Sequence, residues 1–509
     1  MKNFLITVLA SLSLGLAGAQ PKYWISFTDK PAPASGQCFV SEAAVRNRQL
    51  LRLPMCQPTD VPVSAAYLAR LRALGVQPVH QSKWLNAASA YLDADQWAAV
   101  QGLPFVREVT PITVQLIAAG TPEPESISTV LTQIGGREFI ANGLTGKDVK
   151  VGVIDVGFYG LTTNRSLAHL LQEERIKDVK DFVTPSRTDL FNENETHSDY
   201  HGAEVLQMLT GYDPERKMQY GLATGAHFYL ARTDHGIREA RTEEDNWIAA
   251  VERLDSLGVR LVNTSLGYAL GFSNPKENYK PSEMNGHTSK ISRAAQVAVE
   301  EKGMFIVVSA GNEGDDARWR IVSTPADAQG VLSVGATKAK SRDKMSYSSI
   351  GPDFLPYLKP NVSCFAPNGT SFAAPVITGF AACLIEKNPA LTNRQLMRII
   401  EKSAHLYPYG NTYVGYGVPD ARKALALADD STAAVNTVKE VRAKGNSYAY
   451  SVTQPDAEKA VVFHKKNAVV VLRQELLVVD GGKLTVRREP NETRTTLDLG
   501  TEIVEVFWE

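Results

Sequence analysis

The sequence predicts an α/β protein: a doubly wound parallel sheet with helices on both faces, preceded by a ferredoxin-like α+β unit and followed by a small β-rich domain. Three observations lead to this fold class. Across residues 131–428, near-continuous apolar runs alternate with segments of helical spacing, as in a parallel sheet covered on both faces. Residues 20–117 follow the strand and helix order of a split βαβ unit. Residues 429–509 hold mainly short strand-like runs.

The first 19 residues have the pattern of a secretory signal peptide. One lysine, Lys2, precedes an apolar stretch that ends in Ala-Gly-Ala, a small-residue cleavage pattern. A membrane anchor is the weaker interpretation, because the run is short for a span and Pro21 follows at once. No later stretch approaches the ~20 apolar residues of a spanning helix. We therefore expect a secreted protein, periplasmic or extracellular, with no stable membrane span.

The composition limits the classes of function that the protein can have. With 509 residues the chain is long enough for several domains. It is 44% hydrophobic and 21% charged, with a net charge of −1, so it should be soluble, and nothing predicts a nucleic acid or an anionic membrane as partner. Function must therefore come from a specific site.

The four cysteines are few for a secreted scaffold. Cys38 and Cys56 are close enough in sequence to bridge a loop, which geometry must decide. Cys364 and Cys383 are expected to behave as small buried hydrophobes, because Cys383 lies in the apolar run "GFAACLI".

The ferredoxin-like unit contains six pieces in the order strand, helix, strand, strand, helix, strand. They are "KYWISFT", "SAAYLARLRALG", "VQPVHQ", "WLNAASAYL", "DADQWAAVQGL" and "FVREVTPI". An insert, residues 29–60, separates the first strand from the first helix, and the sequence assigns it no role. Residues 118–130 are predicted to be a linker, because this stretch is rich in Pro, Glu and Ser and has no apolar period.

The central domain, residues 131–428, supplies the expected sheet. Its strands are "VKVGVI", "HFYLA", "VRLVN", "MFIVVS" and "VLSVG", and its helices include "TEEDNWIAAVERLDSLG" and "SKISRAAQVAVEEKG". Catalytic residues belong at the carboxyl ends of such strands. In residues 429–509 the strands are "KAVVFH", "AVVVLRQELLVV" and "KLTVRRE", with "DGG" as a turn signal. This last domain could be a stabilising β unit or an address for secretion.

Three residues stand at element edges where a reactive group would be accessible. Asp155 ends the strand "VKVGVID", His201 opens the helix in "HSDYHGAEVLQML", and Ser371 begins "SFAAPVITGFAACLIEK". Each has an ordinary structural explanation. An Asp or Ser at such a position is often a helix cap, and a lone His is more often structural or solvated than catalytic. Taken singly, none indicates catalysis.

Taken together, the three residues indicate nucleophilic catalysis. They follow in the order Asp, His, Ser within one α/β domain, which is one of the known orders of a Ser-His-Asp triad. Asn312 lies between them in "SAGNEG", where its amide could donate to an oxyanion. The absence of G-x-S-x-G argues against the α/β-hydrolase order. No CxxC or HExxH occurs, so neither a catalytic zinc nor another metal site is predicted.

These stretches resemble the motifs of the subtilisin-like serine proteases, or subtilases. "VGVIDVG" resembles the aspartate motif, "HGAEV" the histidine motif, "SAGNEG" the oxyanion segment and "NGTSFAAP" the serine motif. The layout of "RTEEDNW", "NTSLGY" and "NGHTSKISRAA" further resembles secreted subtilases of Bacteroidetes-type bacteria. The N-terminal unit likewise resembles the family's propeptide, an intramolecular chaperone and inhibitor.

The resemblance implies a serine endopeptidase that acts on polypeptide substrates and is inhibited by its own propeptide. Asp155, His201 and Ser371 would form the triad, and Asn312 part of the oxyanion hole. Two stretches would bind substrate along the cleft, with a third in the wall of a pocket: Ser265-Leu266-Gly267, Ala310-Gly311 and Thr324-Pro325-Ala326. No cofactor is required for this chemistry. Calcium is common in the family, but the sequence does not reveal a site for it.

Two departures from the family pattern leave alternatives open. Val156 and Ala203 stand where the family usually has Ser or Thr, which puts the orientation of Asp155 and His201 in doubt. "KPNVSCFAPNGTS" is also shorter than usual. The alternatives are a surface protein that binds a partner through a decayed cleft, and a hydrolase or transferase that uses the triad on an ester.

Overall fold

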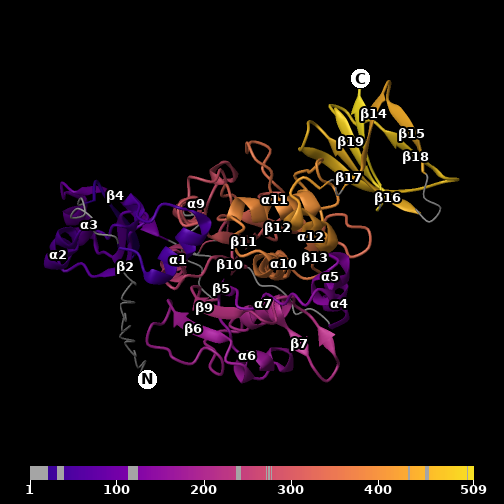
Figure 1. Ribbon diagram of the computed structural model, residues 1–509. Coiled ribbons are helices and arrows are strands. Elements are labelled where there is room, and N and C mark those ends of the chain that lie inside the picture. Colours follow the sequence, from indigo (N-terminus) through magenta and orange to yellow (C-terminus); the bar gives the residue numbers. More distant parts are fainter. Residues whose placement is uncertain are drawn as a thin grey trace, which may run out of the picture.

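The computed structural model describes residues 21–30, 39–112, 124–236, 242–270, 272, 276, 278–433, 436–452, 458–500 and 502–509. The expected signal peptide lies outside these residues. Figure 1 shows three parts in chain order, with the N-terminal unit at one end of the central domain and the β-rich C-terminal domain at the other. None of the helices in the described ranges combines the length and the apolar character needed to cross a bilayer.

The N-terminal unit has the predicted βαββαβ order. Its antiparallel sheet has the strand order β2-β3-β1-β4. The strands are β1 (Lys22–Phe27), β2 (Pro78–Ser82), β3 (Ala87–Tyr91) and β4 (Val106–Ile112), and the helices are α2 (Ala65–Ala73) and α3 (Ala94–Gln101). One sheet face packs on α2 and α3 through Ile25, Leu71 and Val100. Trp24 and Ala87 instead belong to a core shared with the central domain.

The sequence assigned no role to the insert, and its described residues 39–60 are largely helical. It contains α1 (Glu42–Leu51) and a 3₁₀ turn, η1 (Pro58–Asp60). The Ser41 side chain caps α1 by accepting a hydrogen bond from the Ala44 backbone N–H, and the left-handed residue Arg52 ends the helix. Cys56 is disulfide-bonded, while Cys38 lies outside the described residues.

The central domain is built on a seven-stranded parallel sheet of order β13-β12-β11-β10-β5-β9-β6. The strands are β5 (Lys150–Asp155), β6 (Ile176–Asp181), β9 (His227–Arg232), β10 (Leu261–Thr264), β11 (Phe305–Ser309), β12 (Leu332–Thr337) and β13 (Val362–Phe365). All but β6 and β13 were predicted. Most of these strands are fully buried, as a sheet covered on both faces requires.

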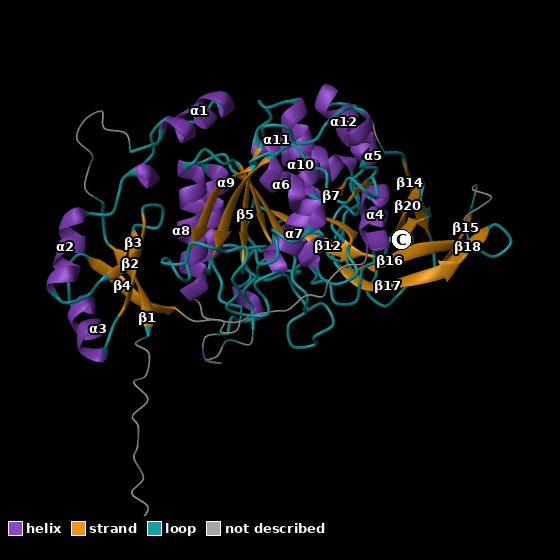
Figure 2. Ribbon diagram, turned by 90° about the horizontal axis from the view of Figure 1, so that it is seen from below, coloured by secondary structure: helices purple, strands orange, loops and turns teal. Residues whose placement is uncertain are grey.

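Helices cover both faces of this sheet (Figure 2). On one face lie α8 (Thr242–Ser256) and α9 (Lys290–Glu300), and on the other α7 (His201–Thr210) and α10 (Ala374–Lys387). Further helices are α5 (Arg137–Ala141), α6 (Ala168–Gln172), α11 (Asn393–Ser403) and α12 (Ala421–Asp429), with 3₁₀ turns η2 (Arg165–Leu167), η4 (Pro281–Glu283) and η5 (Thr370–Phe372) and a small hairpin of β7 (Tyr212–Asp213) and β8 (Met218–Gln219). The two cysteines here, Cys364 and Cys383, are free and buried.

The predicted linker is partly helical. Within residues 118–130 the structure describes the start of α4 (Pro124–Gln133), so an irregular connection over that whole range was the wrong expectation. Val130, Leu131 and Ile134 are buried in the core that α7 and α10 share. Burial of these apolar residues, which follow the polar stretch, stabilises a helix that composition alone did not reveal.

The C-terminal domain contains a five-stranded sheet, β14-β20-β19-β16-β17, and a two-stranded sheet, β15-β18. Their bounds are β14 (Val438–Ala443), β15 (Ser447–Ser451), β16 (Lys459–Lys465), β17 (Val471–Val478), β18 (Lys483–Arg487), β19 (Arg494–Asp498) and β20 (Ile503–Trp508). The predicted turn at 480–482 joins β17 to β18, so it connects the two sheets. The His405 side chain of the central domain contacts Asp498 at 3.0 Å and joins the two domains.

Candidate active site

Asp155 and His201 form a hydrogen-bonded pair at the carboxyl edge of the central sheet. Asp155 is the last residue of β5 and is fully buried, and His201 is the first residue of α7. His201 Nδ1 donates to Asp155 Oδ1 at 2.6 Å, and the Val156 backbone N–H donates to the same oxygen at 2.9 Å. Nδ1 therefore carries the proton, and the neutral ring has Nε2 available as a base.

The electrostatic balance around His201 favours its protonated form. Burial lowers the pKa of His201, but the charge of Asp155 and the hydrogen bond to it raise the pKa more, with smaller contributions from Glu204 and Asp234. The net result is a pKa above the ordinary value of histidine. An imidazole arranged in this way is a stronger proton acceptor than a free one.

Ser371 lies beside this pair in a tight 3₁₀ turn. It is the middle residue of η5, which packs against α7, and the ring of the next residue, Phe372, lies 5.7 Å from the His201 ring. The sequence suggested that Ser371 also caps the following helix, which is wrong. Helix α10 begins at Ala374 and has no side-chain cap, and the Ser371 hydroxyl donates to the Ser265 carbonyl at 3.3 Å. The hydroxyl is therefore not engaged with the helix end.

Asn312 is held with its amide oxygen turned away from solvent. Its Oδ1 accepts hydrogen bonds from the Thr370 backbone N–H at 2.9 Å and from the Thr370 hydroxyl at 3.1 Å. Because the oxygen is occupied in this way, the amide N–H₂ is the end available to a ligand. Thr370, adjacent to Ser371, therefore orients Asn312, a role that only its place in "GTS" could have suggested.

The two stretches expected to bind substrate lie next to Ser371. Ser265, Leu266 and Gly267 follow β10, and Ser265 Oγ donates to the Ser371 carbonyl at 2.8 Å. Ala310 and Gly311 follow β11, and the Gly311 N–H donates to the Thr370 hydroxyl at 3.1 Å. A Cβ atom built on Gly267 would lie 2.1 Å from Ser323 Oγ, so a larger residue there would displace the Ser323 hydroxyl. Of the expected pocket wall, Thr324 forms a bridge with Tyr268.

Arg232 is a buried residue at the carboxyl edge of the sheet, next to the strand that ends in Asp155, and sequence reasoning did not identify it. It ends β9 in register with Asp155 and is fully buried. Its guanidinium donates to the Val156 carbonyl at 2.9 Å, to Asp181 at 2.9 Å and to Glu195 at 2.7 Å, and lies 3.9 Å from Asp199.

Asp199 in turn contacts the turn after Asp155. Its backbone carbonyl accepts from the Tyr159 N–H at 2.9 Å, and a Cβ atom on Gly157 would clash with it. The Gly202 N–H, next to His201, donates to the Gly157 carbonyl at 2.9 Å. Arg232 thus contacts both the segment that carries Asp155 and the segment that carries His201. Val156 and Ala203 have no hydroxyl group that could hydrogen-bond between these segments.

A second buried acid lies close to the pair. Asp234 accepts a hydrogen bond from the Tyr268 hydroxyl at 3.0 Å and another from Thr233. Burial, together with the charge of Asp155, raises the pKa of Asp234 to about 6 even though both hydroxyls lower it. Asp155 Oδ2 has no hydrogen-bond partner among the described residues.

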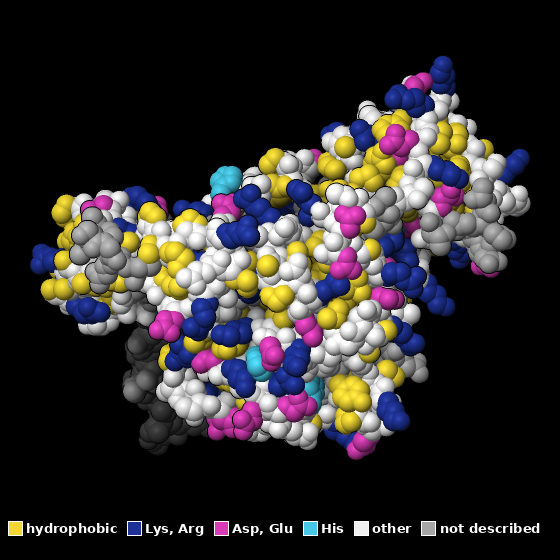
Figure 3. Space-filling model, in the orientation of Figure 1, with side chains coloured by type: hydrophobic (Ala, Val, Ile, Leu, Met, Phe, Trp, Pro, Cys, Tyr) yellow, Lys and Arg dark blue, Asp and Glu magenta, His cyan; other side chains and the backbone are white. Residues whose placement is uncertain are grey.

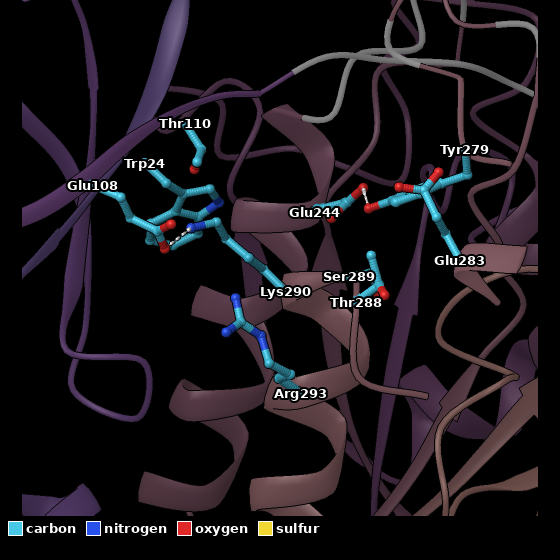
Figure 4. Close-up of a pocket in the computed structure, with 10 residues that line it drawn as sticks. All are labelled: Trp24, Glu108, Thr110, Glu244, Tyr279, Glu283, Thr288, Ser289, Lys290 and Arg293. Atoms are coloured by element: carbon cyan, nitrogen blue, oxygen red, sulfur yellow. Dashed lines mark hydrogen bonds and ion pairs between the residues drawn. The ribbon is translucent and has the colours of Figure 1, made fainter. Parts of the chain in front are cut away.

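A pocket lies at the seam between the N-terminal unit and the central domain (Figure 4). Trp24 and Glu108 come from the N-terminal sheet, and Glu244, Lys290 and Arg293 from the helices α8 and α9. Lys290 Nζ lies 3.9 Å from Glu108 Oε1. The pocket therefore belongs to the contact between the two domains. Within the described ranges, no group of three or more His, Cys, Asp or Glu residues could hold a metal ion.

Comparison with known families gives the class of the protein. The chain belongs to the subtilase family, because residues 146–417, more than half of its length, match the family described as Subtilase family. Residues 22–125 match the Peptidase S8 propeptide domain of Bacteroidota. It is therefore a subtilisin-like serine protease, a hydrolase of peptide bonds, with an N-terminal propeptide.

Particular relatives support the same assignment. The chain is 25% identical to subtilisin NAT of Bacillus subtilis subsp. natto over 354 residues, which cover 68% of this chain and 82% of the relative. It is 23% identical to an alkaline protease of Alkalihalobacillus alcalophilus, covering 82% and 96%. Among solved structures, the epidermin leader peptide processing serine protease of Staphylococcus aureus has the same fold, with a TM-score of 0.55, 16% identity and coverage of 82% and 100%.

Proposed function

We propose that the protein is a secreted serine endopeptidase in which Ser371 attacks the peptide carbonyl. His201 takes the hydroxyl proton through Nε2 and later delivers it to the leaving amine, and Asp155 orients the imidazole and stabilises its cation. The bond to the leaving amine breaks as the acyl-enzyme forms, and water then hydrolyses the Ser371 ester by the same proton transfers in reverse. No cofactor is needed for these steps.

The observation that carries the proposal is the 2.6 Å hydrogen bond between His201 Nδ1 and Asp155 Oδ1 beside Ser371. The orientation of Asn312 supports it further, because its amide N–H₂ and the Ser371 backbone N–H would donate to the oxyanion of the tetrahedral intermediate. Two stretches would hold an extended peptide by backbone pairing, Ser265–Gly267 and Ala310–Gly311. Pairing of this kind selects polypeptides as substrates with little regard to sequence.

The N-terminal unit acts, in this proposal, as the inhibitor of the site until it is cut. Residues 113–123 lie outside the described residues, and the chain would be cut within the stretch "ITVQLIAAGTPEPES" that contains them. Export through the signal peptide would place maturation outside the cytoplasm. The mature N-terminus is expected between residues 112 and 135.

The test compares casein hydrolysis by the wild type and by Ser371→Ala after secretion. The wild type should release its N-terminal unit and then cut casein, whereas Ser371→Ala should stay full length and inactive. Peptide sequencing of the mature form checks the cleavage position. If the wild type stays intact and cuts no casein, the protease proposal fails and a surface protein that binds a partner becomes the better interpretation. If it cuts only an ester substrate, it is a hydrolase or transferase that acts on esters.

A further inference from the structure

The insert between β1 and α2 contacts the central domain directly. We call residues 39–60 the insert segment. Its helix α1 lies apart from the sheet of the N-terminal unit (Figure 2) and packs against α8. Ser41 Oγ donates to the Ser256 carbonyl at 2.7 Å, and Asn47 Nδ2 donates to the Gly258 carbonyl at 2.9 Å. A Cβ atom on Gly258 would lie 2.8 Å from that of Ala43, so α1 lies tight against the turn that follows α8.

A buried network of alternating charges crosses this contact. Arg48 and Asp60 of the insert segment form a bidentate pair, at 2.7 and 2.9 Å. From the central domain, Lys302 Nζ lies 3.0 Å from Asp60, and Asp255 lies 3.7 Å from Arg48. The side chains of Arg48, Asp60 and Lys302 are each at most 2% exposed.

Hydrogen bonds to uncharged acceptors continue the same contact. Lys302 Nζ also donates to Thr59 Oγ1 at 2.6 Å, and Gln57 Nε2 donates to the Glu301 carbonyl at 3.0 Å. The Lys302 ammonium additionally lies 5.7 Å from the centre of the Trp84 ring. Each charge in the network therefore has at least one partner across or within the contact, and removing one weakens the compensation of a buried charge.

The sheet of the N-terminal unit makes a second, separate contact. Lys22 forms a buried ion pair with Asp245 at 2.7 Å, and Trp24 lies in the core cluster that includes α8 and α9. Asp245 is in the first turn of α8, and Asp255 is in its last turn. At 1.5 Å per residue these two positions are about 15 Å apart along the helix. The propeptide thus holds both ends of one helix.

We propose that the insert segment is a second anchor of the propeptide, which keeps it bound to the peptidase domain after the connecting chain has been cut. Two contacts on one folded unit must open together before the unit leaves, because either contact alone keeps the other at high effective concentration. Release of the insert segment then limits how fast the cut propeptide leaves. This role of the insert segment rests on the proposed function.

The experiment uses the Ser371→Ala chain, so that it does not depend on proteolysis by this protein. A recognition site for an unrelated protease is placed within residues 113–123, the chain is cut there, and retention of the propeptide after dilution is followed by size-exclusion chromatography. Lys302→Met removes the charge that the central domain contributes to this contact and leaves the Arg48–Asp60 pair intact. Arg48→Met removes the positive charge that the insert segment contributes. Arg46→Met, on the exposed side of α1, is the matched control.

The cut parent chain should retain its propeptide. Lys302→Met and Arg48→Met should raise its dissociation rate about 100-fold, which corresponds to about 2.7 kcal/mol at ~1.4 kcal/mol per tenfold. Arg46→Met should stay within about twofold, and about 0.5 M NaCl should change the parent rate little, because buried pairs are weakly screened. The proposal is overturned if Lys302→Met releases the propeptide no faster than Arg46→Met, or if the cut parent chain dissociates at once.

Discussion

Replacement of Arg232 by Gln should separate its contribution to catalysis from its contribution to stability. The guanidinium makes three hydrogen bonds of 2.7–2.9 Å, to the Val156 carbonyl and to the carboxylates of Asp181 and Glu195. A neutral amide of shorter reach cannot make all three. The substitution therefore leaves the carboxylates of Asp181 and Glu195 without the Arg232 cation. It also removes the hydrogen bond that holds the Val156 carbonyl in the turn after Asp155.

The magnitude follows from these contacts. Breaking a buried ion pair from one side costs about 3–5 kcal/mol, a large share of the ~5–15 kcal/mol by which a domain is stable. At ~2–4 °C per kcal/mol, Tm should fall by roughly 6–20 °C. A displacement of about 1 Å at the catalytic pair costs on the order of 100-fold in rate. We therefore expect kcat to fall about 10- to 100-fold with KM changed less than threefold.

The assay measures kcat and KM on a peptide substrate, with active sites counted by a fluorophosphonate and Tm by calorimetry. Arg253→Gln is the control, because the Arg253–Asp178 pair on the α8 surface is partly exposed and should matter by less than ~0.5 kcal/mol. Arg232→Lys, which keeps the charge but not the planar fork, should fall between wild type and Arg232→Gln. Unchanged kcat per active site in Arg232→Gln, with Tm within 2 °C of the control, would refute the reasoning.

Two further predictions concern the reacting groups. Asn312→Ala should lower kcat about 10²–10³-fold with little change in KM, because its amide acts on the transition state; an equal rise in KM in a steady-state assay would contradict this. The pKa of His201 is raised, so activity, which needs the neutral ring, should rise with pH through a value above ~6.5. The stabilisation that comes from the His201–Asp155 pair has the opposite trend. It is greatest below the pKa that His201 has in the unfolded chain, and it is lost as the pH rises through the raised pKa of His201 in the folded protein. A rate profile with its acid limb below pH 6 would count against this assignment.

The sequence predicted those parts of the fold that depend on local pattern. The continuous apolar runs at β5, β9, β10, β11 and β12 identified a parallel sheet. By contrast, β6 was missed because it is an edge strand rich in charged residues, in which half-buried and exposed positions alternate. Helix α4 was missed because it begins within the stretch rich in Pro, Glu and Ser and has few apolar residues. The capping role suggested for Ser371 was wrong because Ser371 belongs to η5, and the residue at the N-cap of α10 is Ala373.

The parts of the site that could not be predicted depend on contacts between distant segments. Arg232 lies 51 residues from Asp181 and 37 from Glu195, and nothing in "HFYLAR" indicates that its last residue is buried at the carboxyl edge of the sheet. Thr370 and Asn312 are 58 residues apart. The role of the insert segment could not be predicted either, because its residue Asp60 pairs with Lys302, which is more than 200 residues away in the sequence.

The most direct measurement of the central claim is the position of a covalent adduct. The secreted wild type and the variants Ser371→Ala and His201→Ala are each cut within residues 113–123 by an unrelated protease and separated from the propeptide. They are then treated with a fluorophosphonate, digested, and mapped by mass spectrometry. One phosphonyl group should form on Ser371 in the wild type, none in Ser371→Ala, and labelling of His201→Ala should be slower by several orders of magnitude. An adduct on another residue, or equal labelling of wild type and His201→Ala, would contradict the triad.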